Sequence, residues 1–74
     1  MVEVLDAKGL MCPMPIVQLA KKFKNMKVGE EIELLATDVG SKADVPAWCQ
    51  RTGNELVDAR EENGVYIYRI KKLK

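Results

Sequence analysis

The chain contains no histidine, only two cysteines and five scattered glycines, and these scarcities exclude several kinds of site. Without histidine there is no Ser–His or Cys–His nucleophile pair, no His-ligated metal and no general base of the usual kind near neutral pH. Cys12 and Cys49 are too few for a four-thiolate zinc site and too far apart for a Cys-x-x-Cys redox pair. The glycines lie at least eleven residues apart, so they form no phosphate-binding loop. We therefore expect neither metal nor cofactor, and any chemistry has to use a thiol.

Charge and hydrophobicity are balanced along the chain. Twelve Lys and Arg face eleven Asp and Glu, and this net charge of +1 gives no reason to expect nucleic acid or an acidic membrane as the main partner. The 74 residues suit one small domain spanning 1–74, because chains of this size bury only about 60% of their unfolded surface. No apolar run approaches the ~20 residues of a membrane span, and the acidic N-terminus is unlike a secretory signal. We expect a cytoplasmic protein, in which free thiols persist.

Hydrophobic patterning predicts six elements in the order βαβαββ. Strands are predicted for 2–5, 31–37, 55–61 and 65–70, and helices begin at Pro13 and near Ser41 and end at Gly29 and Gly53. The second helix begins either at Ser41, which opens a capping-box-like pattern, or at Asp44, because Pro46 disturbs the first turn. The economical assembly is an α+β fold, a two-layer α/β sandwich with two helices on one face of a four-stranded mixed sheet.

Cys12 is the candidate nucleophile, because it directly precedes the first predicted helix. Proline is favoured in the first helical position, so Pro13 would place Cys12 at the N-cap. The positive end of the helix dipole would lower the thiol pKa there. Pro15 has no N–H, which leaves the Met14 N–H as the main local donor to the sulfur. We expect a stabilised but still nucleophilic thiolate.

Four residues near Cys12 have a supporting or an open role. Asp6 would bond the local backbone and Gly9 would allow a positive φ in the turn before the cysteine. Lys8 either adds a nearby cation or is solvated. Asp38, at the end of the second strand, either shapes the Cys12 loop, receives a partner, or is simply a solvated acid.

Cys49 has two possible roles. Beside Trp48 on an amphipathic helix it would be a packed structural thiol. Alternatively it would be a resolving partner that forms a disulfide with Cys12, which requires Cα atoms within about 7 Å.

The segment LDAKGLMCPMP, residues 5–15, resembles the D-x-x-G-x-x-C-P-x-P signature of the TusA/SirA-like sulfur-carrier family. Residues 27–30, Thr37-Asp38 and 44–49 are also similar, so the resemblance covers essentially the whole chain. It implies the same βαβαββ sandwich, akin to the C-terminal domain of a translation initiation factor. It also implies that Cys12 carries sulfane sulfur as a persulfide. The supporting residues of the thiol loop would be Asp6, Gly9, Pro13, Met14, Pro15 and Asp38.

The resemblance further implies two protein partners. A cysteine desulfurase or rhodanese-like protein would donate the sulfur, and a DsrE-like protein or the tRNA-thiolation machinery would accept it. Persulfide exchange depends on thiolate fraction and access, and it needs no metal. The residues alone leave open the donor, the acceptor, the pathway (tRNA thiolation or sulfur oxidation) and the oligomeric state.

Two other functions remain open at this point. The thiol could serve a regulator or redox sensor that transfers no sulfur. Alternatively, lysines at 21, 22, 24 and 27, a basic C-terminus, and stacking by Tyr66 and Tyr68 would suit a nucleic-acid-binding module. The near-zero net charge and the absence of an RNP-like or G-x-x-G motif oppose the second function.

Overall fold

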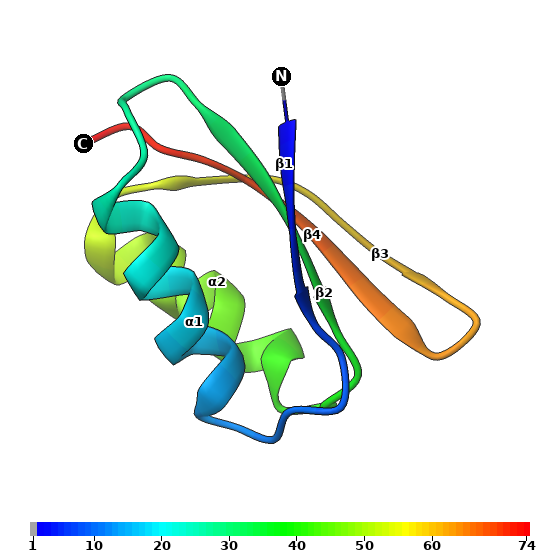
Figure 1. Ribbon diagram of the computed structural model, residues 1–74. Coiled ribbons are helices and arrows are strands. Elements are labelled where there is room, and N and C mark those ends of the chain that lie inside the picture. Colours follow the sequence, from blue (N-terminus) through cyan, green and yellow to red (C-terminus); the bar gives the residue numbers. More distant parts are fainter. Residues whose placement is uncertain (1) are drawn as a thin grey trace.

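The computed structural model describes residues 2–74 and has the predicted βαβαββ order (Figure 1). Its elements are β1 Val2–Ala7, α1 Met14–Lys24, β2 Glu31–Ala36, α2 Ser41–Thr52, β3 Glu55–Glu62 and β4 Val65–Lys71. The strands form one sheet in the order β1-β2-β4-β3, with β1 and β2 parallel and the other two pairings antiparallel. Both helices cover the same face of this sheet. The predicted two-layer α+β sandwich with a mixed sheet is confirmed.

The parallel pairing of β1 with β2 positions the loops that follow them. Val2 lies opposite Glu31 and Ala7 lies opposite Ala36, so the two strands end level with each other. The loop from β1 to α1 and the loop from β2 to α2 therefore leave the same edge of the sheet. This register places the Cys12 segment beside Asp38, although 26 residues separate them in the chain.

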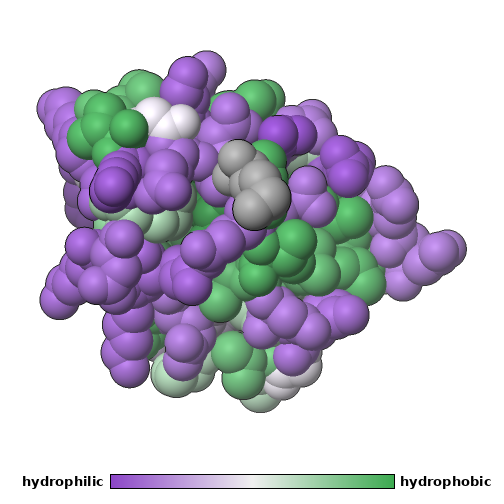
Figure 2. Space-filling view, turned by 45° about the horizontal axis from the view of Figure 1, so that its top comes forward, coloured by the Kyte–Doolittle hydropathy of each residue, from purple (hydrophilic) through white to green (hydrophobic). Residues whose placement is uncertain are grey.

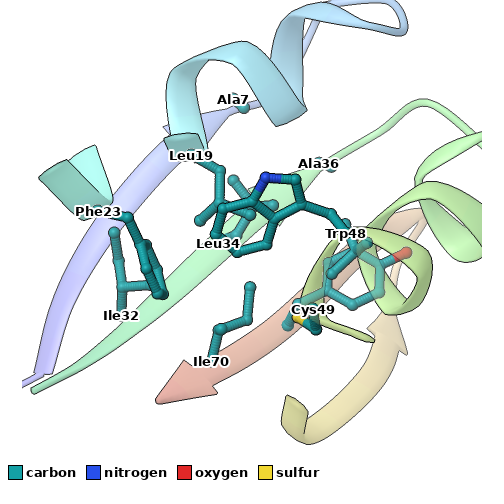
Figure 3. Packing of buried hydrophobic residues seen from close by; sticks show 11 residues of the cluster. Ala7, Leu19, Phe23, Ile32, Leu34, Ala36, Trp48, Cys49 and Ile70 are labelled. Carbon is teal, nitrogen blue, oxygen red and sulfur yellow. The ribbon is translucent and has the colours of Figure 1, made fainter. Parts of the chain in front are cut away.

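The core lies between the helices and the sheet (Figure 3). Strand β2 alternates as predicted, with Ile32, Leu34 and Ala36 fully buried against the helices. Phe23 of α1 meets Trp48 of α2 edge to face, with ring centroids 4.9 Å apart, a geometry worth about 0.5–1.5 kcal/mol beyond area burial. On the face seen in Figure 2, hydrophilic side chains surround patches of hydrophobic ones.

Helix α1 is shorter than the sequence predicted at both ends. It begins at Met14, with Pro13 as the N-cap at φ −96° and ψ 14°, which is not a helical conformation. Cys12 therefore lies outside the helix and is not its N-cap. The helix ends at Lys24 instead of continuing to Gly29, and the Lys72 ammonium satisfies the carbonyl of Phe23 near this end.

Helix α2 begins at Ser41, the first of the two predicted starts, and contains Pro46 in its interior. The predicted capping box is not formed: Gly40 is the N-cap and no side chain bonds the free N–H groups. The Ser41 hydroxyl instead shares a 2.8 Å hydrogen bond with the hydroxyl of Tyr68, inside the core. The helix ends at Gly53 with φ 77°, as predicted.

The strands differ from the prediction by one or two residues at their ends. Strand β1 continues to Ala7, β2 stops at Ala36, and the β3–β4 hairpin is one residue longer on each strand. The Asn63-Gly64 turn has two positive φ values, 52° and 79°, which is the geometry expected of a two-residue hairpin. Within residues 2–74, none of the helices combines the length and the apolar character that a membrane span requires.

Candidate functional site

Two cross-links attach the Cys12 loop to the end of β2. The backbone N–H of Cys12 donates to Asp38 Oδ2 at 2.8 Å, and the N–H of Gly9 donates to Thr37 Oγ1 at 2.9 Å. Gly9 has the positive φ expected of it, 82°. The Asp38 carboxylate therefore hydrogen-bonds the loop of the cysteine, which is consistent with the loop-shaping role expected of it.

The remaining predicted residues lie around this loop in different ways. The Asp6 carboxylate accepts the N–H of Lys8 at 3.0 Å and also pairs with its ammonium at 3.9 Å, so both residues act on the turn and not on the sulfur. Met14 is the first residue of α1 and is 41% exposed. Pro15 is buried at the second position of this helix.

The thiol itself has a carboxylate partner that the sequence reasoning missed. Cys12 is exposed, and its Sγ donates a hydrogen bond to Asp44 Oδ2 at 2.5 Å. The sequence indicates Asp44 as a possible helix cap and as part of the family-like segment 44–49, but not as a partner of the thiol. Its place in the first turn of α2 brings it to the thiol, since this turn follows the same sheet edge as the Cys12 loop.

The expectation of a lowered Cys12 pKa is wrong. The pKa of Cys12 lies above its ordinary value because its hydrogen bond to Asp44 stabilises the protonated thiol; slight desolvation and the negative charges of Asp44 and Asp38 act in the same direction. Cys12 also lies outside α1 and is not the N-cap on which the expected dipole effect depended. The Met14 N–H, expected to serve the sulfur, donates to the carbonyl of Met11 at 2.8 Å.

The loop that contains Cys12 and the loop that contains Gly40 approach each other closely at this edge of the sheet. A Cβ on Gly40 would lie 3.2 Å from Asp38 Oδ2 and 3.7 Å from the Cys12 Cβ. Glycine at this position therefore leaves room for the carboxylate that holds the cysteine. A glycine two residues after Asp38 is the signal available in the sequence, but its meaning depends on the distant Cys12 loop.

A groove of about 270 Å³ opens beside the thiol, between α1 and α2. Its lining residues are Cys12, Pro13, Ile16, Asp44, Ala47, Trp48 and Arg51. Three apolar side chains near the cysteine in sequence or on the neighbouring loop are exposed: Met11, Met14 and Val39. The thiol thus lies at one end of an open, partly apolar surface that a second molecule can reach.

Cys49 lies in a different environment. Its side chain is 3% exposed within the core, and burial raises its thiol pKa to about 11. Both cysteines are free, with Cys12 exposed and Cys49 buried. These observations support the packing role for Cys49 and leave Cys12 as the accessible thiol.

The structure also weakens the nucleic-acid hypothesis. Tyr68 is only 3% exposed and its hydroxyl bonds Ser41, so its ring offers no stacking surface. Tyr66 is half-buried, with the Lys42 ammonium 5.7 Å from its ring centroid. Among residues 2–74, no group of three or more acidic or cysteine side chains is placed to hold a metal ion.

The fold and the exposed cysteine on its proline-rich turn define a class of small thiol-bearing α+β proteins. The solved structure of a SirA-like protein from Desulfitobacterium hafniense has this fold, with a TM-score of 0.83 over 100% of both chains at 21% identity. The family model described as sulfurtransferase TusA matches residues 3–72, and the chain belongs to the TusA family. This confirms the resemblance read from the cysteine–proline motif.

Relatives at higher identity are named as sulfur carrier proteins, YrkF as a putative one. The sulfur carrier protein TusA of Allochromatium vinosum is 44% identical over 70 residues, which cover 95% of this chain and 92% of that protein. The sulfur carrier protein TusA of Pseudomonas aeruginosa strain LESB58 is 41% identical over 69 residues, with 93% and 87% covered. YrkF of Bacillus subtilis is 48% identical over 69 residues, which are 93% of this chain but only 37% of that longer protein.

Proposed function

We propose that this protein is a sulfur carrier that accepts sulfane sulfur as a persulfide on Cys12 and passes it to an acceptor protein. The observation that carries the proposal is the exposed thiol of Cys12, held on an ordered loop by Asp38 at the mouth of a groove. Membership of the TusA family and relatives named as sulfur carriers support it. The buried Cys49 offers no second site of loading in the described chain.

The transfer requires two thiolate attacks and no oxidant. Cys12 first loses its proton to solvent, and its thiolate attacks the outer sulfur of a donor persulfide. A new S–S bond forms on Cys12 as the S–S bond of the donor breaks, and the donor leaves as a thiolate. An acceptor thiolate then attacks the outer sulfur of the Cys12 persulfide, and Cys12 leaves as a thiolate. The sulfur keeps its oxidation level throughout.

Both partners in this scheme are proteins of the cytoplasm. The donor is a cysteine desulfurase or a rhodanese-like protein, and the acceptor is a DsrE-like protein or a component of tRNA thiolation. The apolar side chains of Met11, Met14 and Val39 support docking at this edge, since exposed apolar groups around a reactive residue favour association.

Mass spectrometry tests the proposal directly. The protein is incubated with a cysteine desulfurase and cysteine, or with a rhodanese and thiosulfate, and we expect a gain of one sulfur atom on Cys12. Cys12→Ser should gain none, while Cys49→Ala, matched for loss of one thiol, should load as the wild type does. Absence of the adduct with both donors would refute the carrier function.

The rival function as a redox sensor is opposed by the electrostatics of the site. Sensor cysteines are oxidised readily because their pKa is low. The Asp44 hydrogen bond moves the pKa of Cys12 in the opposite direction. Faster peroxide oxidation of Cys12 than of a free cysteine peptide, together with no sulfur loading, would favour the sensor.

A further inference from the structure

The groove beside Cys12 has opposite charges at its two ends. Asp44 and Arg51 are both on α2 and both line the groove. Seven residues are nearly two helical turns, so the two side chains leave the same side of the helix about 10 Å apart along its axis. Ala47 and Trp48 lie between them, and Ile16 of α1 forms part of the opposite wall.

Asp44 and Arg51 each suit their own end of the α2 dipole, but neither has an ion-pair partner among the described residues. The ion pairs found within residues 2–74 join five other acids, Glu3, Asp6, Glu31, Asp58 and Glu62, to Lys or Arg. Neither Asp44 nor Arg51 takes part in them. The side-chain bond that Asp44 makes is with the Cys12 thiol. Between Asp44 and Arg51, neither of which is in an ion pair of the described chain, the groove has an apolar floor. It is therefore complementary to a ligand with a positive group facing Asp44 and a negative group facing Arg51.

We propose that this groove binds an extended, cysteine-bearing segment of a partner protein, with a Lys or Arg near the cysteine facing Asp44 and an Asp or Glu about three residues further on facing Arg51. The spacing follows from the rise of an extended chain, about 3.3 Å per residue, over the ~10 Å between the two charges. The inference rests on the proposed carrier function, because it assigns the manner in which the partner's sulfur reaches Cys12.

Binding of this segment also activates the thiol. The partner's cation competes for the Asp44 carboxylate and weakens the Sγ–H···Oδ2 hydrogen bond. The negative charge that opposes ionisation of Cys12 is then neutralised, so the proton leaves to solvent and the thiolate attacks the sulfur brought by the segment. In the free protein the same hydrogen bond favours the protonated form of the exposed thiol.

Three synthetic peptides test the proposal, each with one cysteine activated as its 2-pyridyl disulfide. The matched peptide has Lys beside the cysteine and Glu three residues beyond the Lys, the reversed peptide exchanges these charges, and the neutral peptide has Gln at both places. The Cys12 thiolate attacks the peptide sulfur, an S–S bond forms between them, the bond to the pyridine sulfur breaks, and pyridine-2-thione leaves. Its absorbance gives the rate.

We expect the matched peptide to react about two- to fivefold faster than the neutral one at low salt, and the reversed peptide to be slower, because exposed ion pairs have effects of this size. The difference should shrink as salt is added. Ratios between peptides are compared within each variant, so that a general change in thiol reactivity cancels.

Two variants and two matched controls locate the effect. Asp44→Asn should abolish the advantage of Lys, and Arg51→Gln should abolish that of Glu. Glu33 and Lys71 alternate with the buried Ile32 and Ile70, so they lie on the sheet face away from the helices. Glu33→Gln and Lys71→Gln remove the same charges there and should keep the preference.

The proposal is overturned if the reversed peptide reacts as fast as the matched one, or if the control variants change the ratio as much as Asp44→Asn and Arg51→Gln do. Sulfur loading from a desulfurase is measured separately on the wild type. Loading without a charge preference refutes the groove but keeps the carrier function, whereas a preference without loading refutes the carrier function alone.

Discussion

Replacing Tyr68 with Phe should destabilise the protein far more than the loss of one oxygen atom suggests. The Tyr68 hydroxyl bonds Ser41 Oγ at 2.8 Å, and both side chains are almost fully buried, at 3% and 2% exposure. This bond attaches the first residue of α2 to the middle of β4, and so fixes the helix that carries Asp44. Tyr68→Phe leaves the Ser41 hydroxyl in the core without a partner.

The expected loss follows from the size of the chain. An unsatisfied buried hydroxyl costs about 1–3 kcal/mol, while a chain of 74 residues has a total stability of about 4–11 kcal/mol at about 0.05–0.15 kcal/mol per residue. The entropy of unfolding, at about 2.1 cal/mol/K per residue, is about 155 cal/mol/K, so each kcal/mol lowers Tm by about 6 °C. Tyr68→Phe should therefore lower Tm by about 6–18 °C.

A double-mutant cycle isolates this bond from other effects of the substitutions. Ser41→Ala strands the Tyr68 hydroxyl in the same way, but Ser41→Ala with Tyr68→Phe leaves no buried hydroxyl unpaired. The double variant should be more stable than the sum of the two losses predicts, by about 0.5–3 kcal/mol. Urea unfolding followed by circular dichroism measures all four proteins. Strictly additive losses would show that the hydrogen bond is not the source of the effect.

Two further predictions concern the thiols. Asp44→Asn should lower the pKa of Cys12, because the acid that stabilises the protonated thiol is lost; the pH profile of alkylation by iodoacetamide should then move to lower pH, and an unchanged profile would contradict the assigned cause. For Cys49 the folded pKa of about 11 exceeds the ordinary value of 9.0, so its neutral form is favoured by folding. Below about pH 9 the Cys49 thiol is protonated in both states and its burial contributes fully to stability. Between about pH 9 and about 11 the thiol ionises in the unfolded chain but not in the folded one, so the free energy of unfolding falls by about 2–3 kcal/mol. Subtracting the urea-unfolding free energies of Cys49→Ala from those of the wild type at each pH should show this decline, and a flat difference would refute it.

The fold could be predicted because its signals are local. The alternation of Ile32, Leu34 and Ala36 identifies β2 and its buried face, and Asn63-Gly64 identifies the hairpin. The helix ends were less predictable, because tertiary contacts decide them. The Ser41 hydroxyl, for example, bonds the distant Tyr68 instead of capping α2.

In the candidate site, too, some properties follow from local sequence and others depend on distant residues. The cysteine–proline motif identified Cys12 as the exposed thiol, but its pKa depends on Asp44, which is 32 residues away in the chain. The dipole of α1 alone predicts a lowered pKa, whereas the distant acid raises the pKa of Cys12. The register of β1 with β2 brings the two segments together, and no local pattern shows that an acid in the first turn of α2 reaches the sulfur.

A carboxylate beside the reactive thiol is consistent with a carrier that has to be selective. Cys12 is exposed, so no steric barrier protects it from solvent oxidants or unrelated disulfides. The thiolate and not the thiol is the nucleophile, and the Asp44 hydrogen bond limits the thiolate in the free protein. A thiol of higher pKa is also the stronger nucleophile once it is ionised. A partner whose cation neutralises Asp44 would therefore meet a thiolate that is intrinsically reactive, while molecules without this cation meet a protonated thiol. In a protein without histidine, the proton on the sulfur is then controlled by the docking partner, and selectivity and reactivity depend on the same contact.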